Sequence, residues 1–252
     1  MTETEIRSFN RYELKYLLDV DFAEEVMKRL EAYMVPDSHG DKYGNYVLSS
    51  LYYDSDDFHF YWEKVEGLRY RRKLRIRLYE DGKKLTDTSK VYVEIKQRLD
   101  RVTQKRRIIL PYKKALELCD QRIPLHFDNE RDQMIGEEIH SMTHVYDLKP
   151  QCITSYHRRA FNGTEYDPGL RVTFDTNLRY RRNNLDLAAK QLGPFMLAPH
   201  RCVMEIKVND RIPYWLTELA ADQNFQLIRV SKYCAGLEMA EIVPRSQYVF
   251  DN

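Results

Sequence analysis

Basic residues recur at every second position in one stretch of the chain. Between positions 69 and 80 the sequence RYRRKLRIRLYE contains, in this alternation, Arg71, Lys73, Arg75 and Arg77. Side chains of a β-strand point alternately to its two faces, so these four cations would share one face. Their spacing of about 7 Å costs repulsion unless an anion with many oxygen atoms lies between them. The pattern therefore predicts a face that binds phosphate groups.

Other stretches of the chain repeat this arrangement on strands of their own. The further basic residues that alternation places on such faces are Lys15, Lys96, Lys105, Arg107, Arg158, Arg171 and Lys207. A polar sheet face in water, with ion pairs between neighbouring strands, would explain any single one of these strands. The repetition over so many strands favours a shared anion, and closing the strands into a barrel would gather the rows in one tunnel.

Single carboxylates interrupt the basic rows. Glu13, Glu94 and Glu205 each share a face with lysine or arginine. A carboxylate repels phosphate directly, whereas a divalent cation between the two makes the contact attractive, and Mg²⁺ and Mn²⁺ prefer such hard oxygen ligands. We therefore interpret the pattern as a metal-assisted polyphosphate site rather than a flat surface for nucleic acid.

Several familiar motifs for phosphate, acyl-transfer and metal chemistry do not occur in the sequence. It contains neither G-x-x-x-x-G-K-[ST] nor G-x-G-x-x-G, so side chains rather than a backbone loop must hold any phosphate. G-x-S-x-G and paired C-x-x-C motifs are absent as well. A rival metal constellation is Glu137, His140 and His144 on one helix face; the alternative is a helix face in solvent or over the tunnel end.

The elements that must position these residues are mostly strands. The patterns predict strands over residues 6–18, 45–53, 70–80, 91–99, 102–110, 152–161, 170–175 and 203–208. They predict helices over residues 21–34, 56–63, 111–119, 130–146, 213–223 and 232–242, with Asp54 or Ser55 as the N-cap of the second. The fold class is therefore α+β, in a single domain over residues 1–252 with a weaker insertion at 119–146.

The composition limits the classes of function. The 252 residues include 40 Lys and Arg against 39 Asp and Glu, a net charge of +1, which argues against a general nucleic-acid coat. With 43% hydrophobic residues the chain is not disordered, and no apolar run is long enough to span a bilayer. The polar, acidic N-terminus is no signal peptide, so we expect a cytoplasmic protein. The widely spaced Cys119, Cys152, Cys202 and Cys234 are expected to be free, buried thiols.

Eight short motifs, in the order in which they occur, resemble the VTC (vacuolar transporter chaperone) domain, the polyphosphate polymerase branch of the triphosphate tunnel metalloenzymes. They are RYELKY at 11–16, LRIR at 74–77, VEIK at 93–96, KRR at 105–107, YxRxAF at 156–161, RxxxD at 171–175, MEIK at 204–207 and SKY at 231–233. Each motif is short, but the ordered set covers about residues 7 to 240. Arg11 stands where the wider superfamily often has a glutamate, which fits the polymerase branch better than the hydrolases.

The resemblance implies a fold, an activity and partners. The fold would be a closed antiparallel eight-stranded β-tunnel with helices packed outside. The activity would be transfer of the γ-phosphate of ATP to a growing inorganic polyphosphate chain, with Mn²⁺ or Mg²⁺ as cofactor. ATP and polyphosphate are the expected ligands and no nucleic acid is expected. Membrane association would require a separate membrane protein, and the sequence favours no oligomeric state.

The resemblance also assigns roles to residues. Lys232, Arg75 and Arg77 would be catalytic, with Lys232 in contact with phosphate near the reacting centre. Glu205 would hold the metal, and Glu13 and Glu94 are further candidates. The substrate-binding residues would be Lys15, Lys73, Lys96, Lys105, Arg107, Arg158, Arg171 and Lys207.

Three other functions agree with parts of the pattern. A tunnel enzyme that hydrolyses tripolyphosphate or an RNA 5′-triphosphate would share the ligands and differ in its acceptor. A non-catalytic polyphosphate- or nucleotide-binding module would lose the metal glutamate or the C-terminal lysine, and both Glu205 and Lys232 are present. An RNA-binding protein would bind without divalent ions and with a steep dependence on salt.

Overall fold

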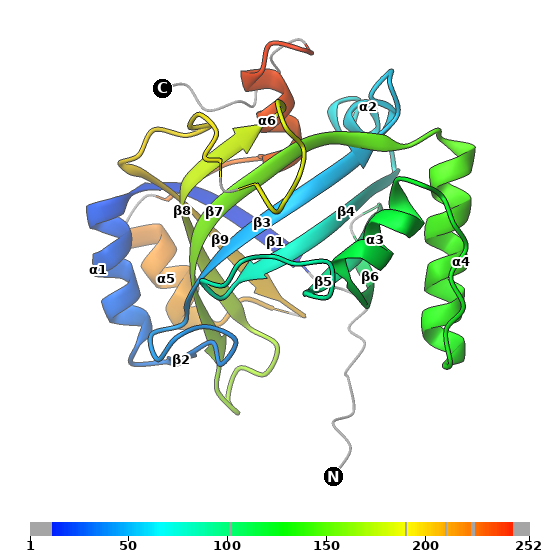
Figure 1. Ribbon diagram of the computed structural model, residues 1–252. Helices are drawn as coiled ribbons and strands as arrows, with labels where there is room; N and C mark the ends of the chain where they lie inside the picture. The colour runs from blue at the N-terminus through cyan, green and yellow to red at the C-terminus, as the bar shows by residue number, and fades with distance from the viewer. Residues whose placement is uncertain (1–11, 101, 190, 210, 223–224, 244–252) are drawn as a thin grey trace.

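One large antiparallel sheet forms the centre of the molecule (Figure 1). The computed structural model describes residues 12–100, 102–189, 191–209, 211–222 and 225–243. Its strands are β1 (Tyr12–Asp19), β2 (Met34–Pro36), β3 (Asn45–Asp54), β4 (Tyr70–Glu80), β5 (Lys90–Leu99), β6 (Val102–Pro111), β7 (Lys149–Gly163), β8 (Arg171–Arg181), β9 (Arg201–Val208) and β10 (Gln226–Leu227). Its helices are α1 (Val20–Leu30), α2 (His59–Val65), α3 (Tyr112–Cys119), α4 (Glu130–Val145), α5 (Tyr214–Asp222) and α6 (Lys232–Met239).

The sheet curls, but among the described residues its hydrogen-bonded ladder has 10 strands and does not close, so the predicted closed eight-stranded tunnel is not confirmed. The 10 strands follow the order β10-β1-β9-β8-β7-β3-β4-β5-β6, with β2 beside β7. Within the described residues β6 pairs only with β5, and β10 occupies the second edge of β1 at Tyr16 and Leu17. Side chains connect the two ends: Lys96 Nζ on β5 lies 2.9 Å from Glu13 Oε2 on β1.

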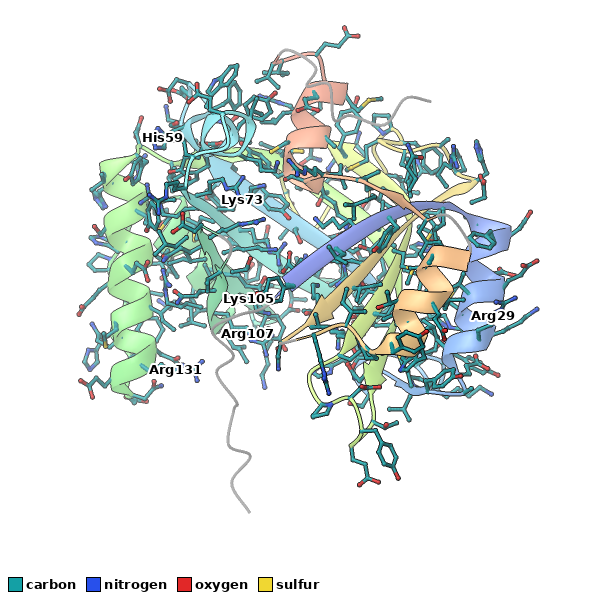
Figure 2. All side chains as sticks on the ribbon, turned by 180° about the vertical axis from the view of Figure 1, so that it is seen from behind. Arg29, His59, Lys73, Lys105, Arg107 and Arg131 are labelled. Atoms are coloured by element: carbon teal, nitrogen blue, oxygen red, sulfur yellow. The ribbon has the colours of Figure 1, made fainter. Side chains whose placement is uncertain are left out.

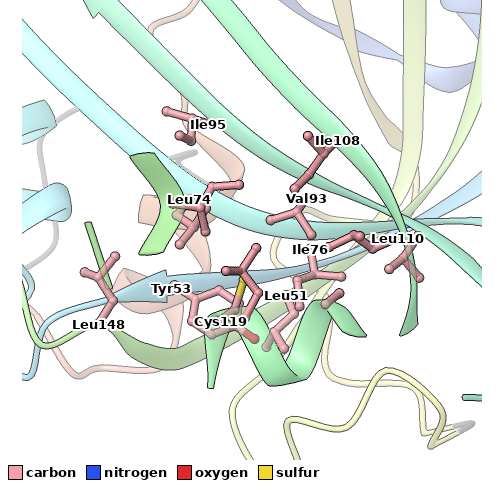
Figure 3. Packing of buried hydrophobic residues seen from close by; sticks show 14 of the residues in the cluster. Leu51, Tyr53, Leu74, Ile76, Val93, Ile95, Ile108, Leu110, Cys119 and Leu148 are labelled. Atoms are coloured by element: carbon pink, nitrogen blue, oxygen red, sulfur yellow. The ribbon is translucent and has the colours of Figure 1, made fainter. Parts of the chain in front are cut away.

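The alternation seen in the sequence places apolar side chains on the outer face of the sheet. Leu74, Ile76 and Val93 are fully buried beneath α3 and α4 in one cluster (Figure 3). A second cluster packs Val172 and Met204 against α1 and α5. Burial of each such side chain contributes about 1.5–3 kcal/mol, so the two clusters hold the helices outside and leave the charged face inside.

Most predicted elements are present, and the differences have local causes. The strand expected at 170–175 continues to Arg181, past a bulge at which Asn177 has a φ of 52°. The second helix begins at His59, later than predicted, with Phe58 as its N-cap. Asp54 and Ser55 still accept hydrogen bonds from backbone N–H groups of its first turn. Residues 6–11 of the first predicted strand, including Arg11, lie outside the described part.

Helix α6 is fixed against the sheet by buried polar and close apolar contacts. Tyr233 Oη donates to Asp54 Oδ2 at 2.6 Å, and the N-cap Ser231 accepts from the N–H of Cys234. A Cβ atom on Gly236 would come within 3.0 Å of Cys152 Sγ, so glycine permits the close approach of α6 to β7. These contacts fix the position of Lys232, the first residue of the helix.

Two sequence-based expectations concern redox state and membranes. All four cysteines are free and buried, as predicted. Among the described residues, no helix combines the length and apolar character needed to cross a lipid bilayer.

Candidate functional site

The inner face of the curled sheet carries charged side chains from seven strands and from α6. We call this set the charged interior. Its basic members are Lys15, Lys73, Arg75, Arg77, Lys96, Lys105, Arg158, Lys207 and Lys232. Its acidic members are Glu13, Glu94, Asp175 and Glu205. Figure 2 shows Lys73 and Lys105 on this side of the sheet, whereas Arg29 and Arg131 lie on the outer helices α1 and α4.

Glu94 is a fully buried anchor for two cations. Its Oε2 accepts from Arg75 Nη2 at 2.6 Å, and Lys105 Nζ lies 3.4 Å from its Oε1. Burial alone would raise the pKa of this carboxyl, but Arg75 and Lys105 lower it below its ordinary value. Within the described residues, Oε1 accepts no hydrogen bond. Glu94 therefore stays ionised and fixes the position of the Arg75 guanidinium.

A second acidic centre lies where β1 and β9 pair. Glu205 is 3.1 Å from Lys207 and 3.8 Å from Lys15. Burial opposes its ionisation, but Lys207, Lys15 and other lysines lower the pKa of Glu205 well below its usual range. Burial also raises the pKa of the neighbouring Glu13, but Lys96, Lys207 and Lys15 together lower it to about 2. The two carboxylates are therefore charged and surrounded by lysines.

Asp175 joins two of the predicted residues, although the sequence reasoning gave it no role. Its carboxylate accepts from Arg158 Nε at 2.6 Å, and Lys232 Nζ lies 2.6 Å from Oδ2. Burial would raise the pKa of Asp175, but Arg158 and Lys232 lower it to about 2. Asp175 is the last residue of the RxxxD motif. Its position on the same strand face as Arg171 was the sequence signal that could have identified it as a site residue.

Tyr156 is a second residue that the sequence reasoning missed. Its hydroxyl accepts from Arg77 Nη2 at 2.8 Å. Its ring lies 4.6 Å from Lys232 Nζ and 5.2 Å from the guanidinium carbon of Arg158. Tyr156 therefore contacts three cations, one through its hydroxyl and two through its ring. It is only 2% exposed, and cation–π contacts are strongest in such a buried setting.

Smaller contacts fix the remaining predicted residues. Lys15 donates to the carbonyl of Val230 at 2.8 Å, and Lys73 donates to Ser231 Oγ, so both reach the segment that leads into α6. Arg75 and Arg77 donate to two further residues without a predicted role, the hydroxyls of Tyr52 and Ser50.

Two predicted residues lie at the margin of this network. Arg171 pairs with Asp37 and donates to Tyr46 Oη at 2.9 Å, although it stands opposite Lys207 in the β8–β9 register. Arg107 on β6 stands opposite Glu94 on β5. Its guanidinium packs over the ring of Tyr92 at 5.0 Å. Arg171 is therefore neutralised by a carboxylate outside the charged interior, and no ion pair is described for Arg107.

The metal-binding capacity of the charged interior rests on carboxylate oxygens. Among the described residues, no group of three or more His, Cys, Asp or Glu side chains is arranged to hold a metal ion. The rival group on α4 has other partners, because His140 and His144 donate to backbone carbonyls and Glu137 accepts from Gln133. Glu205 and Glu13 do fit Mg²⁺ or Mn²⁺, which bind through one or two carboxylates and take the other oxygens from phosphate and water.

Comparison with known proteins identifies the family. The VTC domain family matches residues 10–241. The chain belongs to the VTC domain family. The match runs from β1 to α6, so every charged residue of the interior lies within the VTC domain, and the resemblance seen in the sequence is confirmed.

The curated relatives of this VTC domain are much longer proteins. It is 28% identical over 221 residues to the vacuolar transporter chaperone complex subunit 4 of Trypanosoma brucei brucei, covering 75% of this chain and 28% of the relative. It is 27% identical over 222 residues to the subunit 4 of Trypanosoma cruzi, with the same coverage of 75% and 28%. Among solved structures, a Pyrococcus horikoshii protein aligns with a TM-score of 0.45 and 12% identity over 91% of this chain and 99% of that one.

Proposed function

We propose that this VTC domain is a phosphotransferase that moves the γ-phosphate of ATP onto a growing inorganic polyphosphate chain. One observation carries the proposal: in the charged interior, cations outnumber the carboxylates that neutralise them. Buried charges without partners are costly, so a surplus of this kind favours a bound polyanion. The naming of its relatives as vacuolar transporter chaperone complex subunits supports the same family of activities.

The residue types suit phosphoryl transfer. This reaction needs in-line positioning and neutralisation of phosphate oxygens more than covalent chemistry by the protein. Arg75, Arg77 and Lys232 would supply the positive charge, and their partners Glu94, Tyr156 and Asp175 hold them before substrate arrives. Donors that are fixed in advance lose little conformational entropy on binding and stabilise the transition state effectively.

The metal would be held by Glu205, with Glu13 beside it. A bound Mn²⁺ or Mg²⁺ would neutralise charge on adjacent phosphates. Lys15, Lys96 and Lys207 surround the two carboxylates and would contact the phosphate oxygens that complete the site.

A single incubation tests the proposal. Purified protein with ATP and Mn²⁺ should form long-chain polyphosphate, visible on a gel stained for polyanions, together with ADP. Orthophosphate without polymer would show that the protein hydrolyses ATP, and the proposal would be wrong. The same preparation without a divalent cation is the control for metal dependence.

We also propose that the domain acts on the cytoplasmic side as part of a complex whose membrane-spanning part is a separate protein. The support is that both relatives are named as complex subunits. Affinity purification of the tagged protein from membranes of its source cell should recover a membrane protein in stoichiometric amount. Recovery only from the aqueous fraction, without such a protein, would contradict this.

Replacement of Tyr156 separates its two contacts. Tyr156→Phe loses the hydroxyl that accepts from Arg77 and keeps the ring beneath Lys232 and Arg158. Tyr156→Leu loses both. We expect turnover to fall by about tenfold in Tyr156→Phe, because a hydrogen bond to a charged group is lost. We expect a fall of about a hundredfold in Tyr156→Leu, because the buried cation–π contacts are lost as well.

The control is Tyr112→Phe. This removes a comparable hydroxyl, which donates to Asp186 at 2.9 Å on the outer side of the sheet. Polymerase kinetics should show normal turnover for Tyr112→Phe even if its melting temperature falls. Equal loss of turnover in Tyr112→Phe and Tyr156→Phe would assign Tyr156 a purely structural role.

Binding of polyphosphate should depend on the ionisation of Lys207. Burial lowers the pKa of this lysine, Glu205 partly restores it, and the result is about 7. Since Lys207 loses its positive charge as the pH rises through this value, metal-free binding of tripolyphosphate should weaken between about pH 6 and pH 8. Calorimetry should also detect proton uptake on binding near pH 8, because the anion restores the charge.

The matched variant for this prediction is Lys207→Arg, which stays charged throughout the range. Its binding curve should be flatter than that of the wild type around pH 7. The ligand is the same in both titrations, so its own ionisation cancels in the comparison. Identical pH profiles for the two proteins would contradict the prediction.

A further inference from the structure

A groove lies on the outer face of the sheet, and Tyr156 borders both this groove and the charged interior. It has a volume of about 950 Å³ and extends over β3, β4, β7 and β8 between the loops at 81–89 and 185–193. In Figure 1 this part of the sheet lies between α1 and α5 on one side and α3 and α4 on the other. We call it the outer groove. Its size is at the upper end of the range for ligand sites, so it offers room for several side chains.

The lining of the outer groove includes an apolar part. Val47, Leu78 and Ile153 reach it from three neighbouring strands, and Leu187 and Leu192 reach it from the loop that follows β8. Leu192 is 75% exposed, which is unusual for a leucine beside other apolar groups. Ile153 and Leu187 are already buried. The apolar surface that an occupant would remove from water is therefore that of the half-buried Val47 and Leu78 and of Leu192.

The charged side chains of the lining are predominantly basic. Lys83, Lys84 and Lys90 come from one side. Arg179 comes from β8, where its guanidinium packs over the Phe195 ring at 3.5 Å and donates to the Gly193 carbonyl at 2.8 Å. An arginine fixed in this way loses little entropy on binding an anionic group.

The carboxylates of the outer groove already have partners. Glu80 accepts from Ser49 Oγ at 2.5 Å, and Asp81 lies 3.6 Å from Lys83. The lining therefore offers Lys84, Lys90 and Arg179 to acidic groups of a ligand.

We propose that the outer groove binds a peptide segment of a partner protein that combines acidic with apolar side chains. Apolar residues of the segment would cover Val47, Leu78 and Leu192, and its carboxylates would meet the lysines and Arg179. Polyphosphate has no apolar atoms and would gain nothing from that part of the lining. Interfaces commonly combine an apolar centre with arginine contacts in this manner. The proposal does not depend on the activity of the charged interior.

Fluorescence anisotropy tests the proposal with two labelled peptides, one alternating glutamate with leucine and the other glutamate with serine. The wild type should bind the glutamate–leucine peptide and bind the glutamate–serine peptide at least about tenfold more weakly. Lys84→Glu/Lys90→Glu should weaken binding of the first peptide by at least about tenfold, because like charges then face each other. Leu192→Asp should also weaken binding of the first peptide. Because Leu192 is exposed, this substitution should leave the fold intact.

The matched control is Lys28→Glu/Arg29→Glu, which makes the same change of charge at exposed positions on α1 and should bind like the wild type. ATP turnover should be unchanged in every variant, since none alters the charged interior. The proposal is overturned if the wild type does not bind the glutamate–leucine peptide, or if both double variants bind it equally. It is also overturned if Lys84→Glu/Lys90→Glu weakens polyphosphate binding as much as peptide binding, because the groove would then be a polymer site.

Discussion

Lys232→Ala is expected to lower the turnover of ATP into polyphosphate by about 10²–10³-fold, the usual cost of removing one electrostatic donor from a buried site. Lys232 lies at the first turn of α6, 2.6 Å from Asp175 and over the ring of Tyr156. Its charge is retained in the interior, since Asp175 and Tyr156 outweigh burial and raise the pKa of Lys232. The loss should appear in kcat, measured by polymer formation with saturating ATP.

The fold should survive this substitution. Asp175 keeps its two hydrogen bonds from Arg158, so the variant leaves no isolated buried charge. Lys28→Ala on α1 is the control, because it removes an exposed lysine outside the charged interior and should turn over ATP normally. Wild-type kcat in a folded Lys232→Ala protein would refute the catalytic assignment.

Glu205→Gln should lower turnover by a similar factor and, independently, weaken the binding of Mn²⁺. The substitution keeps the size of the side chain and removes the charge that would hold the cation beside Glu13. Electron paramagnetic resonance of free Mn²⁺ gives the affinity without any need for catalysis. We expect the dissociation constant to rise by at least about tenfold, the lower limit for loss of one charged ligand.

The pH of this measurement matters. Glu205 raises the pKa of Lys207, so glutamine at this position should lower that pKa further and remove a phosphate-binding charge near neutral pH. Turnover is therefore compared at about pH 6, where Lys207 is protonated in the wild type. Glu80→Gln, on the outer face, is the matched control. Unchanged Mn²⁺ affinity and turnover in Glu205→Gln would exclude Glu205 as a metal ligand.

The regular elements could be predicted because their patterns are local. The alternation of charged and apolar residues over 70–80 predicted both the bounds of β4 and the face on which Arg75 and Arg77 lie. Strands β2 and β10, with 3 and 2 residues, are too short to show any period and were missed. The extension of β8 was missed because the bulge at Asn177 shifts the alternation by one residue.

The partners within the charged interior could not be predicted in the same way. A period of two residues tells which face a side chain occupies but not which neighbour it meets. Asp175 and Lys232 are distant in sequence and meet because α6 packs against β7 and β8. Arg171 lies on the predicted face of its strand. Its charge is nevertheless neutralised by Asp37, which precedes β3, and not by a phosphate group. The pairing of β10 with the edge of β1 likewise could not be predicted from periodicity.

The interrupted circumference of the sheet has a consequence for a growing polymer. Between β1 and the β5–β6 pair the described residues are joined by side chains such as the partly exposed ion pair of Lys96 on β5 with Glu13 on β1, which contributes about 1 kcal/mol or less. Separating two strands anywhere else would break a row of backbone hydrogen bonds. Among the described residues the wall is therefore weakest along this seam, and we expect a polymer made by the proposed activity to leave sideways there.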